Sequence, residues 1–240
     1  MKLSAARDVL LKPLQAVIGV VERRQTMPIL SNILLVAKNG QLSVTATDLE
    51  VELVASTDVD VEAGGEITVS GRKLLDICKA LPDGADISMA LGGEKLEVRS
   101  GRSRFSLATL PAAEFPTVED IKSEQTISVD QAVLSRLIEK THFSMAQQVV
   151  RYYLNGMLLE TGGEHLRAVA TDGHRLALSQ AAVDMGELSE QQVIVPRKGV
   201  LELQRLLGGE GNVDIQLGAN HVRIELDGIR FTSKLIDGRF

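Results

Sequence analysis

The feature that most constrains this chain is an internal repeat with an offset of 124 residues. Residues 30–48 read LSNILLVAKNGQLSVTATD and residues 154–172 read LNGMLLETGGEHLRAVATD, and the two segments align without a gap. The same offset carries Val9-Leu10 onto Val133-Leu134. A fixed period over separate segments is the mark of a duplicated structural unit, so we expect the two halves of the chain to fold alike.

The offset drifts slightly toward the end of each copy. Arg72-Lys73 falls on Arg197-Lys198 at 125, and Arg104-Phe105 falls on Arg230-Phe231 at 126. Insertions of one or two residues are typical of surface loops. The order of the matching segments is preserved throughout, which favours duplication over chance similarity between two β-rich stretches.

Each copy is expected to begin with a helix. The predicted helices cover about residues 8–22 and 130–141, with Asp8 and Asp130 as N-caps, and Pro13 means that the first one starts late or bends. A second helix is predicted over 72–81 and again over 197–207.

The remaining segments of each copy favour antiparallel strands. Asn39-Gly40 is a strong hairpin turn signal between two apolar runs, and 51–56 alternates charged with apolar residues. Alternating stretches at 95–110 and 221–236 close the two copies. Antiparallel strands between short helices predict an α+β fold with helices packed on one face of the sheets.

The boundary between the copies is predicted near Pro111–Pro116, where two prolines bracket a stretch with the pattern of an extended linker. The predicted domains are therefore 1–116 and 117–240. The chain has 240 residues, 44% hydrophobic and 24% charged, which suits two globular domains with cores of their own.

Composition narrows the class of protein further. No apolar run reaches the roughly 18 residues of a membrane span, and the first residues lack the core of a signal peptide. A single cysteine, Cys78, excludes an internal disulfide and fits a reducing compartment. We therefore expect a soluble cytoplasmic protein, without a membrane partner.

The net charge of −6 hides an uneven distribution. The predicted helical segments (residues 7–24, 72–81, 130–141 and 197–207) carry +6 together, so the rest of the chain carries −12. If the helices share a face, that face attracts phosphates while salt screens the distant acidic surface. The alternative is that these cations are ordinary residues of solvated helix surfaces.

The chain has two tyrosines and no tryptophan, and the tyrosines are adjacent, at Tyr152 and Tyr153. If they lie on a strand, they face opposite ways, one into the core and the other outward. An exposed tyrosine can bond a phosphate or stack on a base, with Arg151 supplying charge. A structural role for at least one of them is the competing interpretation.

Signatures of an enzyme are mostly absent. The four histidines lie far apart, and neither metal-ligand spacing nor a nucleotide-binding glycine motif occurs, so we expect no metal and no cofactor. Asp172 and His174 could suggest acid–base chemistry, but the repeat counterpart, Thr47-Asp48-Leu49-Glu50, has no histidine. Thr-Asp is therefore interpreted as shared turn chemistry, and His174 and Arg175 as binding residues.

Five segments give the chain a family resemblance. RQTMPIL (24–30), SGRSRFSL (100–107), VRYYLNGM (150–157), ATDGHRLA (170–177) and IVPRKGV (194–200) resemble the β sliding clamps of bacterial DNA polymerase III. The resemblance runs along nearly the whole chain.

This resemblance implies a fold and a function. Members of the family have three copies of one clamp domain per subunit, and two subunits close head to tail around duplex DNA, with helices on the inner face and antiparallel sheets outside. They tether the polymerase for processive synthesis and bind peptide motifs of the clamp loader, repair polymerases and other partners. The present chain resembles the first two domains, so we expect a two-domain form that lacks the third domain and does not close the ring.

The resemblance also implies site residues. The DNA contacts would be Arg24, Arg72, Gln148, Tyr152, Tyr153 and Lys198. The peptide pocket would be lined by Leu154, Thr171, Gly173, His174, Arg175 and Leu176. The face toward a second subunit would contain Lys73, Arg102, Arg104, Phe105 and Leu107, with an unpaired, partly apolar strand edge over 103–108.

Two alternatives to a clamp remain open at this stage. One is a protein-interaction module that retains only a partial peptide pocket, and the other is an enzyme that uses Asp172 and His174. Replacing His174 with Ala separates them, because peptide affinity falls modestly if the residue lines a pocket and turnover vanishes if it is catalytic.

Overall fold

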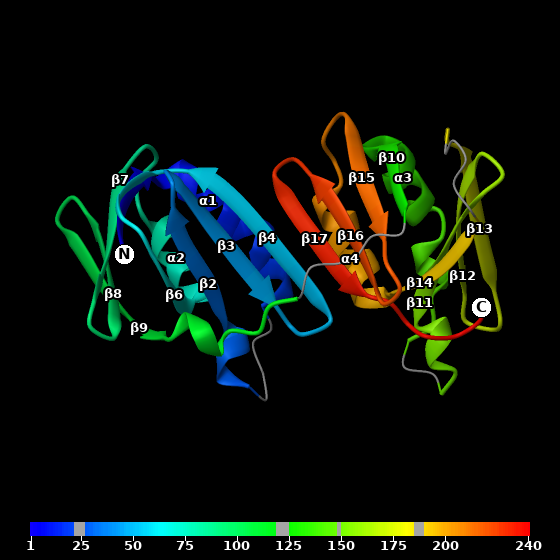
Figure 1. Cartoon of the computed structure of the whole chain (residues 1–240), viewed down its shortest axis with the longest axis horizontal. Helices are drawn as coiled ribbons and strands as arrows, with labels where there is room; N and C mark the ends of the chain where they lie inside the picture. The colour runs from blue at the N-terminus through cyan, green and yellow to red at the C-terminus, as the bar shows by residue number, and fades with distance from the viewer. Residues whose placement is uncertain (22–26, 119–124, 148–149, 185–189) are drawn as a thin grey trace. The chain divides into compact units, whose positions relative to one another are not determined.

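The computed structural model describes residues 1–21, 27–118, 125–147, 150–184 and 190–240 (Figure 1). Contacts within the chain divide it into two compact units, Met1–Val118 (unit 1) and Glu119–Phe240 (unit 2).

The described part of unit 1 holds two α-helices, α1 (Arg7–Val17) and α2 (Gly71–Ala80). Its strands are β1 (Lys2–Ala6), β2 (Asn32–Lys38), β3 (Gln41–Thr47), β4 (Val51–Asp58), β5 (Asp60–Ala63), β6 (Gly65–Ser70), β7 (Asp86–Gly92), β8 (Lys95–Ser100) and β9 (Ser103–Leu110). Its short 3-10 helices are η1 (Ile18–Val20), η2 (Pro28–Ser31) and η3 (Ala112–Glu114).

Unit 2 repeats this plan in its described part, with helices α3 (Gln131–Glu139) and α4 (Arg197–Leu206). Its strands are β10 (Gln125–Asp130), β11 (Gly156–Gly162), β12 (His165–Thr171), β13 (Leu176–Ala182), β14 (Gln191–Pro196), β15 (Asn212–Leu217), β16 (His221–Leu226) and β17 (Ile229–Lys234). Its 3-10 helices are η4 (His142–Ser144) and η5 (Tyr152–Leu154).

Each unit contains the order strand, helix, three strands twice, and unit 1 has one further strand, β5, which pairs with β1. The first strand of each half pairs with a strand of the other half of its unit. In unit 1, β6 pairs with β2 to give β4-β3-β2-β6, while β1 pairs with β7 to give β1-β7-β8-β9. Unit 2 has the corresponding sheets β13-β12-β11-β14 and β10-β15-β16-β17. Every one of these pairings is antiparallel, so the predicted α+β class is confirmed.

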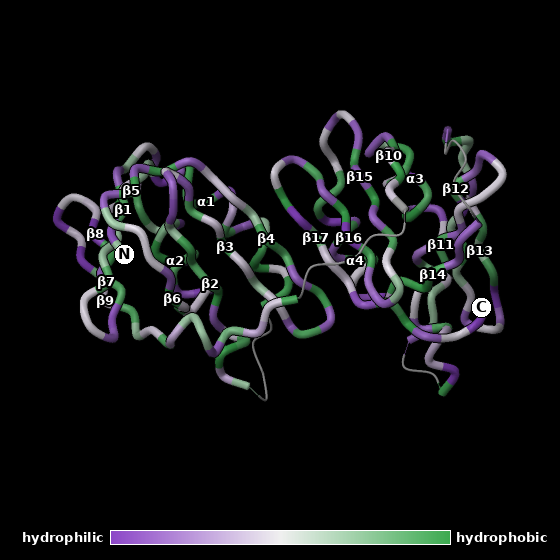
Figure 2. Tube along the Cα trace, in the orientation of Figure 1, coloured by the Kyte–Doolittle hydropathy of each residue, from purple (hydrophilic) through white to green (hydrophobic). Residues whose placement is uncertain are grey.

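The helices of each unit pack against each other and against the sheets. In unit 1, α1 lies on β3 and β4 while α2 lies on β2 and β6; in unit 2, α3 lies on β12 and β13 while α4 lies on β11 and β14. Figure 2 shows hydrophobic residues along the helices and central strands and hydrophilic residues at several hairpin tips. Burial of these helix and strand faces forms a separate core in each unit.

The predicted N-cap is confirmed for α3 but not for α1. Asp130 caps α3 as predicted, since its Oδ1 accepts the N–H groups of Ala132 (2.8 Å) and Val133 (3.3 Å). The assignment of Asp8 as an N-cap is wrong, because α1 already begins at Arg7 and Asp8 forms an ion pair with that residue (2.8 Å). The helix also runs through Pro13 and ends at Val17.

The stretch after β9 is not the extended linker that its two prolines suggested. Residues 112–114 form η3, and the Phe115 side chain is only 6% exposed. It packs on Ile29, Leu30 and Leu34. This segment therefore belongs to the packed body of unit 1.

The helices of the described segments are all too short or too polar to cross a lipid bilayer.

Candidate nucleic-acid and peptide sites

Several of the basic residues counted on the helices are engaged within their own unit. Arg7, with a side chain only 14% exposed, pairs with Asp8 and with Asp83 (2.6 Å) and donates from Nε to the Cys78 carbonyl (2.9 Å). On α4, Arg205 pairs with Glu202 (3.0 Å). The sum of +6 already subtracts Asp8 and Glu202, so among these pairs only Asp83, which lies outside the helical segments, lowers the positive charge available to a ligand.

Arg72 and Arg197 make the same structural contact in the two units. The Arg72 guanidinium donates from Nη2 to the carbonyl of Val21, and Arg197 donates from Nη1 to the carbonyl of Met145 (3.3 Å). Val21 and Met145 differ by the repeat offset of 124. Both arginines therefore hold the chain that leaves the first helical segment, which gives Arg72 a role inside unit 1 besides any contact with a ligand.

Other helical cations face solvent. Lys12, Lys73 and Lys79 are exposed in unit 1, and Arg136 and Lys140 are exposed in unit 2. Lys198 is half-buried on α4. Arg24 and Gln148, which the resemblance assigns to DNA, lie outside the described residues. Lys12, Lys79 and Arg136 had no assignment from the sequence, although helical periodicity places Lys12 and Arg136 opposite the apolar stripe of their helices and Lys79 at the border of the stripe on α2.

The two tyrosines lie on η5, so the strand assumed for them is wrong. Their rings form an edge-to-face pair with centroids 6.1 Å apart. Tyr152 is 58% exposed, whereas Tyr153 is half-buried against a cluster that includes Leu158 and Ile194. A 3-10 helix separates the faces of neighbouring side chains, so one tyrosine is still directed outward.

The Thr171–Arg175 turn is held together by its own side chains. The Thr171 hydroxyl donates to the Arg175 carbonyl (2.6 Å) and accepts the Gly173 N–H (3.1 Å). Asp172 Oδ1 accepts the N–H groups of His174 (2.9 Å) and Arg175 (3.0 Å). These hydrogen bonds lower the pKa of Asp172 to about 2.

The corresponding turn of unit 1 repeats these bonds. The Thr47 hydroxyl donates to the Val51 carbonyl (2.9 Å) and accepts the Leu49 N–H (3.1 Å). Asp48 Oδ1 accepts the N–H groups of Glu50 (2.9 Å) and Val51 (2.7 Å). The interpretation of Thr-Asp as shared turn chemistry is confirmed.

The Thr171–Arg175 turn has further contacts from residues that occur only in unit 2. The Arg175 guanidinium donates to Asp172 Oδ2 (3.1 Å) and to the Phe143 carbonyl (2.6 Å), and its Cζ lies 5.8 Å from the centre of the Phe143 ring. Phe143 is 50% exposed, and no motif in the sequence had pointed to it. His174 and Gly173, in the same turn as Arg175, are exposed.

The apolar residues of this region differ in accessibility. Leu154 is buried, so it can form only the floor of a site, while Leu176 and Leu178 on the edge strand β13 are 64% and 53% exposed. The structure thus brings together an exposed turn, an exposed aromatic ring and an exposed pair of leucines, which suits an apolar peptide oriented by polar groups.

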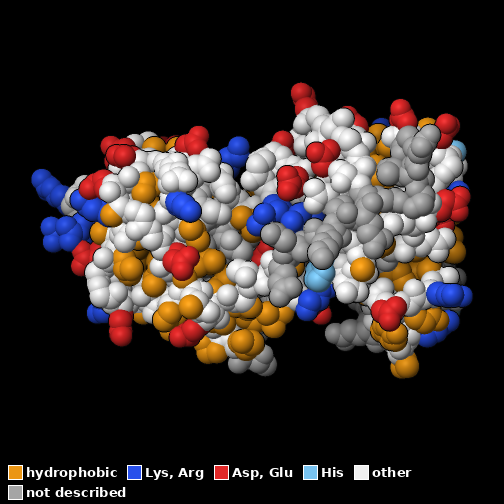
Figure 3. Space-filling model, in the orientation of Figure 1, with side chains coloured by type: hydrophobic (Ala, Val, Ile, Leu, Met, Phe, Trp, Pro, Cys, Tyr) orange, Lys and Arg blue, Asp and Glu red, His pale blue; other side chains and the backbone are white. Residues whose placement is uncertain are grey.

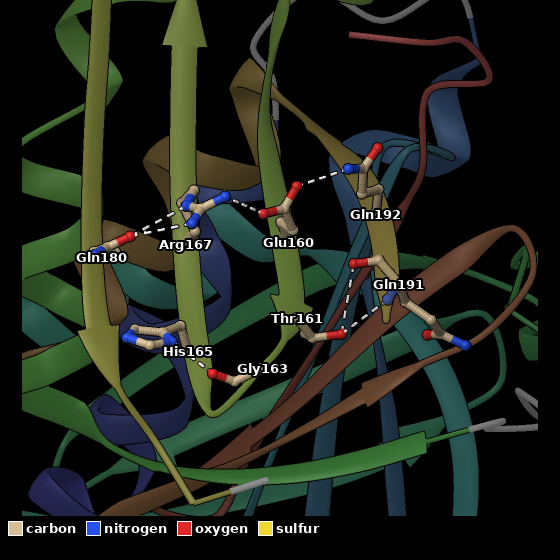
Figure 4. A network of polar contacts seen from close by, with 8 residues as sticks. All are labelled: Glu160, Thr161, Gly163, His165, Arg167, Gln180, Gln191 and Gln192. Atoms are coloured by element: carbon tan, nitrogen blue, oxygen red, sulfur yellow. Dashed lines mark hydrogen bonds and ion pairs between the residues drawn. The ribbon is translucent and has the colours of Figure 1, made fainter. Parts of the chain in front are cut away.

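A row of polar side chains crosses the sheet β13-β12-β11-β14 two residues further along β13 than Leu178. Gln180, Arg167, Glu160 and Gln192 stand opposite one another on four neighbouring strands (Figure 4). Arg167 bonds to Glu160 and Gln180, and Gln192 donates to Glu160 (2.6 Å). These contacts are satisfied across the strands, so the row stabilises the sheet face.

The residues assigned to a subunit contact lie on α2 and on the β8–β9 hairpin. Arg102 and Arg104 are exposed and Phe105 is half-buried, but Leu107 is buried opposite Leu96 and faces the core. Within the described residues, the side of Ser103–Ala108 that faces away from β8 pairs with no strand. This edge can accept a strand from a partner.

Unit 1 and unit 2 are thus two copies of one α+β domain, and comparison with known proteins identifies that domain. The model of the DNA polymerase III beta subunit, N-terminal domain, matches residues 1–119, and the model of its central domain matches residues 128–240. The chain therefore belongs to the family of DNA polymerase III beta subunits.

Individual relatives are similar to this chain over its whole length. The beta sliding clamps of Pseudomonas putida and Escherichia coli K12 are 57% and 54% identical over 242 residues. The crystal structure of the DNA polymerase III subunit beta from Pseudomonas aeruginosa superposes with a TM-score of 0.98 at 55% identity. In each case all of this chain is covered, and it spans 66% of the length of the relative.

Proposed function

We propose that this protein is a sliding clamp subunit that tethers DNA polymerase III to duplex DNA. The observation that carries the proposal is the match of both units, in order, to the first two domains of the beta subunit. The predicted domains 1–116 and 117–240 are part of this proposal, and a DNA partner would place the protein in the cytoplasm.

The exposed helical cations support weak contact with phosphates. Lys12, Lys79 and Arg136 are exposed on helices, and contacts from their charged ends to phosphates carry no sequence information. Contact with phosphates alone suits a device that moves along DNA, since base readout would hold it at particular sites. Arg24, Arg72, Gln148, Tyr152, Tyr153 and Lys198 are proposed to contribute further contacts.

Salt-dependent binding to duplex DNA tests this proposal. Each lost phosphate contact lowers the slope of log K against log salt by about 0.9. The double variant Lys12→Ala, Lys79→Ala should therefore reduce the slope by up to about 2, measured by fluorescence anisotropy with two duplexes of unrelated sequence. The matched control is Lys38→Ala, Lys95→Ala, which removes two exposed strand cations. An equal loss in both variants would show a general effect of charge.

A second site is proposed for short peptides of replication and repair partners. Its residues are Leu154, Thr171, Gly173, His174, Arg175 and Leu176, to which the structure adds Phe143. Solved structures of the Pseudomonas aeruginosa clamp are 53–55% identical to this chain, and one of them contains bound griselimycin. Griselimycin is therefore a suitable probe of the proposed site.

Calorimetry with griselimycin tests the peptide site. We expect His174→Ala to weaken binding about tenfold, because the exposed imidazole precedes Arg175, which contacts Phe143, in the turn proposed to line the site. Glu50→Ala, at the equivalent position of unit 1, is the control and should leave the affinity unchanged. Unaltered affinity in the His174 variant would remove this turn from the site.

The same geometry supports a structural role for Asp172 in the turn over a catalytic one. A carboxylate whose pKa is lowered to about 2 and whose Oδ1 holds two backbone N–H groups is a poor general base. We therefore propose no catalytic site, no metal and no cofactor. Lys73, Arg102, Arg104 and Phe105 are proposed to meet another subunit through the free edge of β9.

A further inference from the structure

Unit 1 contains a surface whose residues correspond, through the repeat offset of 124, to the floor of the proposed peptide site in unit 2. Ile29, Leu30 and Leu34 stand 124 residues before Tyr153, Leu154 and Leu158. The Thr47–Val51 turn beside them has the same hydrogen bonds as Thr171–Arg175. The frame of the site is therefore present twice.

In unit 1 this surface is occupied by the protein's own chain. The Phe115 side chain is 6% exposed and packs on Ile29, Leu30 and Leu34. Three residues later, the Val118 N–H donates to the buried carboxylate of Glu52 (2.9 Å). In unit 2 the position of Glu52 is taken by Leu176, which is 64% exposed.

The covering segment, residues 111–118, is held by few hydrogen bonds. Pro111 and Pro116 have no N–H group to donate to a sheet ladder. The backbone bonds of η3 close within the segment itself, from Glu114 to Pro111 (3.2 Å) and from Phe115 to Ala112 (3.0 Å). Among the hydrogen bonds described, that from the Val118 N–H to Glu52 is the one that ties residues 112–118 to the sheet. The segment is otherwise held by the packing of Ala112 and Phe115, so it can open locally when the Phe115 side chain leaves its apolar contacts.

We propose that unit 1 holds a second peptide site that the segment 111–118 keeps closed in cis. The ligand class is a short extended peptide with an aromatic side chain for the Leu30–Leu34 floor and a backbone N–H three residues further on for Glu52. Figure 1 shows η3 beside the segment of η2, and Figure 3 shows hydrophobic side chains gathered along that edge of unit 1. Met27, 44% exposed, lies at the same edge.

The experiment removes the cover and supplies it again in trans. The variant Phe115→Ala is titrated with a capped peptide of residues 111–118, PAAEFPTV, and with the control peptide PAAEAPTV, and circular dichroism confirms that the variant is folded. We expect one PAAEFPTV peptide to bind per chain of the variant. It should bind at least tenfold more tightly than PAAEAPTV binds the variant, and at least tenfold more tightly than PAAEFPTV binds the unaltered protein. The melting temperature of the variant should rise on binding. A folded variant that does not distinguish the two peptides would overturn the proposal.

Hydrogen exchange on the unaltered protein decides the question if Phe115→Ala does not fold. The amides of Phe115 and Val118 should exchange at least tenfold faster than that of Leu35 in β2, because the segment opens without the sheet. Equal protection would mean that the segment is part of the core and that no second site exists. Griselimycin binding in unit 2 is independent of both results, so failure here is distinguishable from failure of the proposed function.

Discussion

At the level of single residues, the turns at 47–51 and 171–175 have the same hydrogen bonds but present different side chains to solvent. Threonine and aspartate hold both turns with the same bonds, and the third position has positive φ in both, 77° at Leu49 and 89° at Gly173. Leucine is strained in this region and glycine is not. The bonds of Thr47 and Asp48 therefore maintain a conformation that the Leu49 side chain itself disfavours.

Asp172 makes the stability of unit 2 depend on pH in acid. Its folded pKa of about 2 lies below the ordinary value of 3.8, so its contribution is present above about pH 4 and is lost as the pH falls toward 2. We expect Asp172→Asn, which cannot ionise, to lose less stability than the parent protein between pH 4 and 2. Urea denaturation followed by tyrosine fluorescence measures this, since Tyr152 and Tyr153 both lie in unit 2.

The control for this measurement is Asp214→Asn, which removes the charge of an exposed carboxylate on β15. Its pH profile should follow that of the parent protein. If the Asp172 variant also followed the parent profile, the turn bonds would not favour the ionised carboxylate.

At the scale of elements, the two first helices begin in different ways. Asp130 satisfies two N–H groups of α3, whereas α1 follows Ala6, which offers no side-chain cap. We expect Asp130→Ala to cost about 1 kcal/mol of unfolding free energy. Urea denaturation of the variant, followed by tyrosine fluorescence, measures this loss.

The matched control is Asp8→Ala in unit 1. Asp8 is exposed and contributes only an ion pair with Arg7, so its loss should cost less than about 0.5 kcal/mol. Because both tyrosines lie in unit 2, the unfolding of this variant is followed by thiol labelling of Cys78 in urea. Equal losses in the two variants would mean that the capping bonds of Asp130 contribute no more than a surface charge.

At the scale of the whole molecule, the chain carries a separate natural probe in each unit. The single cysteine, Cys78, is fully buried in unit 1, and burial raises the pKa of its thiol to about 11, while both tyrosines lie in unit 2. Because each unit has its own core, we expect thiol labelling with Ellman's reagent and tyrosine fluorescence to follow two transitions in urea with different midpoints. Native protein should resist labelling, and Cys78→Ala supplies the blank. Coincident curves would show that the units unfold together.

The repeat, the strands and the approximate helices of both units could be predicted from the chain alone, because hydrophobic periodicity and turn residues such as Asn39-Gly40 act locally. The helix ends at Arg7 and Val17 could not, since capping depends on the strand that leads into the helix. The strand assumed for Tyr152 and Tyr153 was wrong for a related reason, because short apolar runs do not distinguish a strand from a 3-10 turn.

The order of residues along the chain is enough to show that one domain occurs twice, which residues belong to its apolar faces, and which turn chemistry the copies share. Which charges remain available depends on the folded arrangement, since Arg7, Arg72 and Arg197 are engaged by partners distant in sequence. It also decided that Phe115 covers unit 1 while Leu176 remains exposed in unit 2. The physical reason is that patterns along the chain specify which face of an element is buried, whereas the packing of distant segments specifies what buries it.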